Sequence, residues 1–117
     1  MKRFVMAMTI AVLVANLPTA AQAQTAKPAF IKPGKVFEKC MTLEPPQKIE
    51  YRFESATKLN FNLHYQKGDQ TYYPVKLDRT NGESGLYEAK AKEVYCLMWE
   101  NKTSADIELV YSARIVK

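Results

Sequence analysis

The chain has 117 residues, a formal net charge of +5 and two cysteines. This length fits one domain once any targeting segment is set aside, and it limits the core to a modest size. Basic and acidic side chains alternate along most of the chain instead of forming blocks, and no arginine-plus-aromatic arrangement points to nucleic acid as a partner.

The first 23 residues have the order of an export signal. Lys2 and Arg3 precede an apolar run of 14 residues, 4–17, which Pro18 ends. Ala21 and Ala23 then supply the small residues of a signal-peptidase site. Because a spanning helix needs about 20 apolar residues, we expect cleavage near Ala23, no transmembrane anchor, and release into the periplasm or the medium.

Residues 24–34 contain two prolines and a glycine, so we expect a flexible leader ahead of the folded domain at 35–117. Without Lys2 and Arg3, the chain keeps 15 basic and 12 acidic side chains, a net charge of +3. The one basic stretch lies in and just after this leader: Lys27, Lys32, Lys35 and Lys39. Two interpretations are open, a solvated leader or a weak contact with an anionic surface or acidic partner.

Cys40 and Cys96 are the only cysteines, and both follow the signal. In a chain bound for an oxidising compartment, two cysteines allow a single connectivity, so we predict a Cys40–Cys96 disulfide. It would close a loop of about 57 residues, worth roughly 4 kcal/mol in the chain-entropy model. The alternative is a redox or metal-binding thiol pair, although no C-x-x-C motif supports it.

From residue 35 onward, apolar and polar side chains alternate with the period of a β-strand. Ile49, Tyr51 and Phe53 would face inward, for example, with polar residues between them. The expected strands are 36–43, 48–54, 58–65, 71–77, 86–91, 94–99 and 107–115. Seven short strands without helical periodicity predict an all-β, antiparallel β-sandwich.

The connections between these strands carry turn residues. Residues 67–69 predict a hairpin turn around Gly68. Pro74 lacks an N–H and places strand 71–77 at an edge or a bulge. Residues 79–85 form the longest polar segment and predict a turn, and 101–105 predict another.

The last two predicted strands carry a specific run. It reads Tyr95-Cys96-Leu97-Met98-Trp99-Glu100-Asn101-Lys102-Thr103-Ser104, followed by Leu109-Val110-Tyr111, with Gly85-Leu86-Tyr87 ahead of it. This run resembles the closing segment of GOLD (Golgi dynamics) domains. The resemblance implies a β-sandwich, a disulfide from the first strand to the penultimate strand, and a general interaction role, as a bacterial-type single-domain secreted relative.

The same residues have a physical interpretation without the family. Trp99 shares one strand face with Tyr95 and Leu97, so we expect it in the core. Asn101 and Ser104 are turn residues that can cap backbone groups. Asn101-Lys102-Thr103 is also a glycosylation sequon, but we favour the turn role for the asparagine.

Residues for catalysis are few. His64 is the only histidine and lies on an outward strand face, and neither an H-E-x-x-H nor a G-x-S-x-G motif occurs. Met41, Met98 and His64 could be imagined as copper(I) ligands, but two methionines are too few. We therefore expect no enzyme, no cofactor and no metal.

The sequence instead favours a non-enzymatic, secreted or periplasmic binding module for a protein partner. The alternative is an envelope inhibitor of a hydrolase such as lysozyme or a protease, which would use a protruding loop at 79–85 or 67–70. The candidate binding surface mixes directional hydrogen-bonding groups with two edge tyrosines. Its residues are Arg52, Asn60, Asn62, His64, Tyr72 and Tyr73.

Overall fold

A computed structural model describes residues 25–117, and the predicted signal at 1–23 lies outside them. All the regular structure in this part of the chain is β-strand. The six strands are β1 (Lys27–Ile31), β2 (Val36–Leu43), β3 (Lys48–Lys67), β4 (Gln70–Glu88), β5 (Glu93–Glu100) and β6 (Ile107–Val116). Every pairing is antiparallel, which confirms the all-β, antiparallel prediction with six strands in place of seven.

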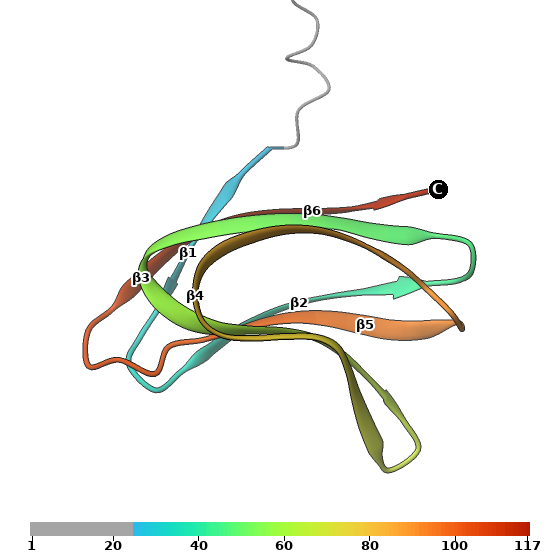
Figure 1. Ribbon diagram of the computed structural model, residues 1–117, viewed down its shortest axis with the longest axis horizontal. Helices are drawn as coiled ribbons and strands as arrows, with labels where there is room; N and C mark the ends of the chain where they lie inside the picture. Colours follow the sequence, from blue (N-terminus) through green and yellow to red (C-terminus); the bar gives the residue numbers. More distant parts are fainter. Residues whose placement is uncertain (1–24) are drawn as a thin grey trace, which may run out of the picture.

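The arrangement depends on β3, a strand of 20 residues. One edge of β3 pairs with β4, while its other edge pairs with β6 over Lys48 to Ser55 and with β5 over Asn60 to His64. The strand order is β1-β6-β3-β5-β2, with β4 beside β3. Figure 1 shows the result, a sheet curled into a half-barrel with β1 and β6 on one side and β2 and β5 on the other.

The curl begins where β3 loses its regular register. The pairing with β4 shifts between Glu54 and Leu59. There the Ser55 hydroxyl donates to the Thr57 carbonyl at 2.7 Å, and the Asn81 side-chain amide on β4 donates to the Ser55 carbonyl at 3.1 Å. Such an irregularity bends a strand and increases its twist. The predicted strands 48–54 and 58–65 are therefore two halves of one bent strand.

The predicted turn at 79–85 is wrong, because these residues lie inside β4. β4 follows the bend of β3, and the polar, irregular residues mark that bend instead of a loop. Arg79 adopts a positive φ of 58° at this point. A Cβ at Gly82 would lie 2.7 Å from the Phe53 carbonyl oxygen, so the close approach of the two strands requires glycine. β4 pairs only with β3, as the edge position of Pro74 predicts.

The flexible leader is also corrected, since residues 24–34 contain β1. β1 pairs with β6, with Lys27 opposite Tyr111 and Ile31 opposite Ile107. Ala29 and Ile31 are buried and alternate with exposed residues, a short period-two pattern that the prolines and lysines conceal. Pro28 is tolerated because β1 is an edge strand.

The core between the two halves is aromatic. Trp99 is 0% exposed, and its ring lies 5.5 Å from that of Phe61 and 5.7 Å from that of Phe53. Tyr111 of β6 and Phe37 of β2 complete the contacts around it. The inward faces assigned by alternation are confirmed: Tyr51, Phe53, Phe61, Trp99 and Leu109 are all buried.

Asn101 joins the ends of both halves and is fully buried. Its side-chain amide donates to the Ile31 and Ala105 carbonyls, both at 2.8 Å, and its Oδ1 accepts from the Thr103 N–H and hydroxyl. Its backbone also bonds to Lys35 and Gly34 in the β1–β2 turn. This asparagine therefore has the turn role that the sequence predicts.

The predicted disulfide is confirmed. Cys40 and Cys96 lie directly opposite each other on β2 and β5, with Cα atoms 4.0 Å apart. Because Tyr95 and Leu97 point into the core, the disulfide lies on the outer face of the sheet, where Cys40 is exposed. No helix in the described residues has the length and hydropathy to cross a membrane.

Replacing Trp99 with alanine should lower the free energy of unfolding by about 3–5 kcal/mol, because the change leaves a large cavity between the two halves. Urea denaturation followed by circular dichroism measures this loss. Val94→Ala, at an exposed position of the same strand, is the matched control and should change stability by less than about 0.5 kcal/mol. A Trp99→Ala protein as stable as the control would contradict the core assignment.

Removing the disulfide with Cys40→Ser and Cys96→Ser together should cost up to about 4 kcal/mol, since the long loop regains its freedom in the unfolded chain. Denaturant midpoints of the variant and the oxidised protein give the difference. Mass spectrometry of the unreduced protein should find no free thiol. Two titratable thiols in freshly purified protein would show that the bond does not form in the cell.

Candidate functional site

Two neighbouring rows of side chains lie on the outer face of the half-sheet formed by β2, β5 and β3, and one of them ends at His64. In the first row, Cys40 pairs with Cys96, which pairs with His64. In the second row, Glu38 pairs with Met98, which pairs with Asn62. Positions two apart on one strand share a face. The strand register therefore gathers these six residues on one surface.

Two polar contacts hold the ring of His64 between the rows. Its Nδ1 lies 2.7 Å from Oδ1 of Asn62, and its Nε2 lies 3.2 Å from Oε2 of Glu38. Asn62 is only 8% exposed. Ligand atoms of Glu38, His64 and Cys96 all lie within 4.8 Å of one another. The imidazole is thus held in a polar setting and is not a freely rotating surface side chain.

The β3–β4 hairpin extends away from the body of the molecule beside this face (Figure 1, lower right). Lys67 pairs with Gln70, which leaves a two-residue turn with Gly68 at a positive φ of 64° and confirms the predicted hairpin. Tyr73, 48% exposed, places its ring 5.8 Å from that of His64. Tyr72, 43% exposed, stacks on Tyr65 at 5.2 Å.

Tyr72 and Tyr73 lie on different faces of the hairpin. Tyr65 connects Tyr72 to the core, because its ring also lies 5.2 Å from that of the buried Tyr95. The Tyr95 hydroxyl donates to the Ala91 carbonyl at 2.7 Å, and burial raises the pKa of this phenol above its ordinary value. Tyr87 packs on Tyr95 from the other half, and burial raises its pKa in the same way. This row of tyrosines supports the base of the hairpin.

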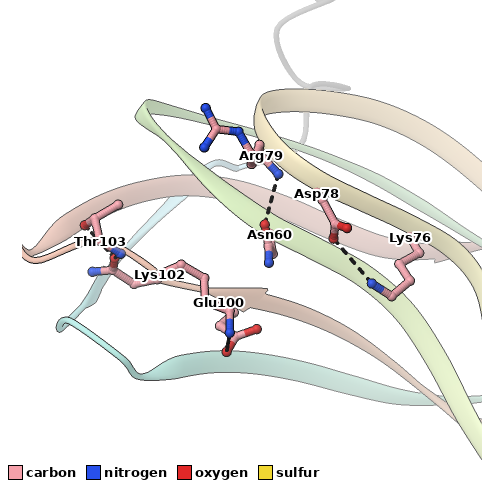
Figure 2. A network of polar contacts seen from close by, with 8 residues as sticks. Asn60, Lys76, Asp78, Arg79, Glu100, Lys102 and Thr103 are labelled. Atoms are coloured by element: carbon pink, nitrogen blue, oxygen red, sulfur yellow. Dashed lines mark hydrogen bonds and ion pairs between the residues drawn. The ribbon is translucent and has the colours of Figure 1, made fainter.

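Asn60 has a structural partner. Its Oδ1 accepts a hydrogen bond of 2.9 Å from the backbone N–H of Arg79, the β4 residue with positive φ (Figure 2). The same view shows the exposed Lys76–Asp78 ion pair just before Arg79 on β4 and the Glu100–Lys102 pair at the end of β5. The amide of Asn60 therefore satisfies backbone at the bend of the two long strands.

Arg52 lies in the other half of the molecule. It precedes the bend of β3 and pairs with Ser84 of β4 and Ser112 of β6, where its side chain is exposed. Apart from Asn60, the predicted surface thus divides into three parts: His64 with Asn62 and Tyr73, Tyr72 on the other face of the hairpin, and Arg52 before the bend. The alternation of β3 gives the outward direction of Arg52 and His64, but not the bend that separates them.

Sequence reasoning missed Glu38 and did not place the disulfide beside His64. Glu38 precedes Cys40 by two positions on a predicted strand, so the sequence does put both on one face. Their distance from His64 depends on the β5–β3 register, which joins segments more than 30 residues apart, Asn60–His64 and Cys96–Glu100. No local pattern reports that register.

Two open hollows lie on the surface near these residues. One, of about 270 Å³, is lined by His64, Tyr65, Gln66, Glu93, Val94 and Cys96. The other, of about 720 Å³, lies near the bend and is lined by Glu54 and by Asp106, Glu108 and Val110 from β6 and the turn before it, together with residues 55–57. Both are surface depressions suited to contact with another molecule's protruding groups.

No family model matches the chain, and a search of curated proteins also finds no match. Among solved structures, the chain is similar to a pre-peptidase C-terminal domain of a Bacillus anthracis collagenase, with a TM-score of 0.59, 14% identity, and coverage of 78% of this chain and 89% of that one.

A second similar structure is the periplasmic inhibitor PliG of g-type lysozyme from Aeromonas hydrophila, with a TM-score of 0.54, 14% identity, and coverage of 88% of this chain and 93% of that one. A third is the Yersinia pseudotuberculosis-derived mitogen, with a TM-score of 0.55, 10% identity, and coverage of 78% and 84%. At these identities the likeness establishes the fold alone.

Asn60→Ala should lower the free energy of unfolding by about 1 kcal/mol, because the Arg79 N–H loses its acceptor. Lys76→Ala, which removes an exposed ion pair on the adjoining strand, is the control and should cost less than about 0.5 kcal/mol. Chemical denaturation of both variants makes the comparison. Equal stability of the two variants would contradict the structural role of Asn60.

Proposed function

We propose that the chain is a non-enzymatic binding module of the cell envelope, a β-sandwich of GOLD type that contacts a protein partner. The observation that carries the proposal is the β3–β4 hairpin, which extends from the body and exposes Tyr72 and Tyr73. Tyrosine combines a large apolar contact area with a hydroxyl, and it is enriched among the residues that dominate binding energy at protein interfaces.

The hairpin is prepared for such a contact by its own packing. Tyr65 stacks under Tyr72, and the turn has only two residues, so little conformational freedom remains to be lost on binding. His64 adjoins Tyr73 and adds a directional hydrogen-bonding group at the base of the hairpin, and the buried Asn62 holds its ring in place. We call these residues the hairpin surface, which covers both faces of the hairpin: His64 and Tyr73 with Asn62 on one face, and Tyr72 on the other.

The proposal places the chain outside the cytoplasm, where an envelope protein is an accessible partner. The Cys40–Cys96 disulfide is typical of proteins that fold in an oxidising compartment. A filled aromatic core also favours a protein partner over an enclosed small molecule, because the hollows described above are open to the surface.

The second candidate is an inhibitor of an envelope hydrolase. Residues 79–85 do not support it, because they lie inside β4 and form no loop. The hairpin turn around Gly68 does support it, since this turn protrudes and could enter a cleft. The similarity in fold to a periplasmic lysozyme inhibitor gives this candidate a concrete target class, the g-type lysozymes.

Immobilised protein should capture a distinct envelope protein, and the double variant Tyr72→Ala with Tyr73→Ala should weaken that capture at least about tenfold, as loss of interface tyrosines does. Leu86→Ala, which removes a 61% exposed apolar side chain on the other half, is the matched control and should capture normally. Melting temperatures of both variants should stay near that of the parent.

The two candidates separate in an activity assay. A stoichiometric amount of the protein that stops a g-type lysozyme, with the effect lost in the tyrosine double variant, selects the inhibitor. Capture of a membrane or secretion component without any effect on the lysozyme selects the interaction module. Capture that both variants retain equally would place the contact away from the hairpin surface.

A further inference from the structure

We propose that Cys40, Cys96, His64 and Glu38 form a redox-gated site for a thiophilic divalent cation such as Zn²⁺, closed while the disulfide is intact and opened by its reduction. The four residues come from β2, β5 and β3 and share the outer face described above. The inference goes beyond the proposed protein-binding function and does not depend on it.

The first support is the distance between the two nonsulfur ligand atoms. Nε2 of His64 lies 3.2 Å from Oε2 of Glu38. Two ligands bound at 2.0–2.2 Å to one tetrahedral zinc ion are about 3.3 Å apart. The imidazole and the carboxylate are therefore already spaced as two ligands of a single ion. Sγ of Cys96 lies within 4.8 Å of a ligand atom of each of these two residues.

The second support is the orientation of the imidazole. Oδ1 of Asn62 is an acceptor 2.7 Å from Nδ1 of His64, so Nδ1 carries the ring proton in this pair. In the neutral ring the lone pair of Nε2 then points at the carboxylate of Glu38. A cation between the two atoms satisfies both. A hydrogen-bonded Nδ1 is also the arrangement that fixes a metal-binding histidine through its outer partner.

The third support is the exposed position of the disulfide. Cys40 is exposed and Cys96 half-buried, so a reductant can reach the bond without opening the core. After reduction, the strand register keeps the Cys96 thiol opposite His64 and the Cys40 thiol opposite Cys96 on the next strand. Thiolate, imidazole and carboxylate together make a donor set that suits zinc.

A protein with a dithiol pair can act as the reductant of the Cys40–Cys96 disulfide. Its two thiols transfer two electrons and two protons to the Cys40–Cys96 bond, which becomes two thiols while the reductant becomes a disulfide. Binding of the cation then replaces the two thiol protons by two metal–sulfur bonds, and both protons pass to solvent. An oxidant that restores the disulfide removes both sulfur ligands and releases the cation.

Cobalt(II) is the probe, since tetrahedral thiolate binding gives it intense visible bands and a sulfur-to-metal charge-transfer band. The purified protein, reduced with a phosphine, should bind one equivalent and release two protons, while the oxidised protein should show no sulfur-to-cobalt band. His64→Ala and Glu38→Ala should each weaken binding at least about tenfold, and Asn62→Ala about tenfold through the imidazole. Glu108→Gln, on the other half, should bind normally.

A second pair of variants avoids the reductant. Cys40→Ser leaves the Cys96 thiol beside His64 and Glu38, whereas Cys40→Ser with Cys96→Ser lacks the disulfide equally but offers no sulfur. Only the first should show the charge-transfer band. Three results would each overturn the proposal. They are cobalt binding that His64→Ala and Glu38→Ala leave unchanged, absence of the charge-transfer band in Cys40→Ser, and a reduced protein that neither stays folded nor refolds with cobalt.

Discussion

The pairing of one strand along both of its edges is the constraint on which the structure depends. β3 borders β4 on one side and β6 and then β5 on the other, so neither half of the molecule can form without it. The irregular residues after Glu54 turn its second half back over its first. That bend brings Phe53 and Phe61, on the same strand, to a ring separation of 4.6 Å and lets both contact Trp99.

The sequence predicts what period-two alternation controls and misses what the bend controls. Inward residues such as Tyr51 and Leu109 are assigned correctly, because a one-residue error would turn every side chain to the wrong face. The polar residues 55–58 and 79–85 have the composition of turns, yet two long strands pass through them together. The disulfide was predictable from cysteine count and compartment, since no other pairing exists.

Candidate site residues were predictable only in their outward direction. His64 and Arg52 both face out, as alternation requires, but the bend assigns them to different halves. The partners that give His64 its chemistry, Glu38 and Cys96, come from strands whose register is set by the packing of the whole core. Polar residues on strands and just after them also satisfy backbone groups. Asn60 on β3 and Asn101 after β5 both do so at points where the chain changes direction.

The placement of β6 between β1 and β3 has a consequence for how the chain reaches its final state. Lys27 pairs with Tyr111, so the earliest strand must wait for the latest one before its hydrogen bonds exist. Loop-closure entropy opposes such distant pairings, and chains dominated by them fold slowly. A ribosome-bound nascent chain lacking β6 cannot complete the upper half of the sheet. β1 therefore joins the sheet only once β6 lies beside β3.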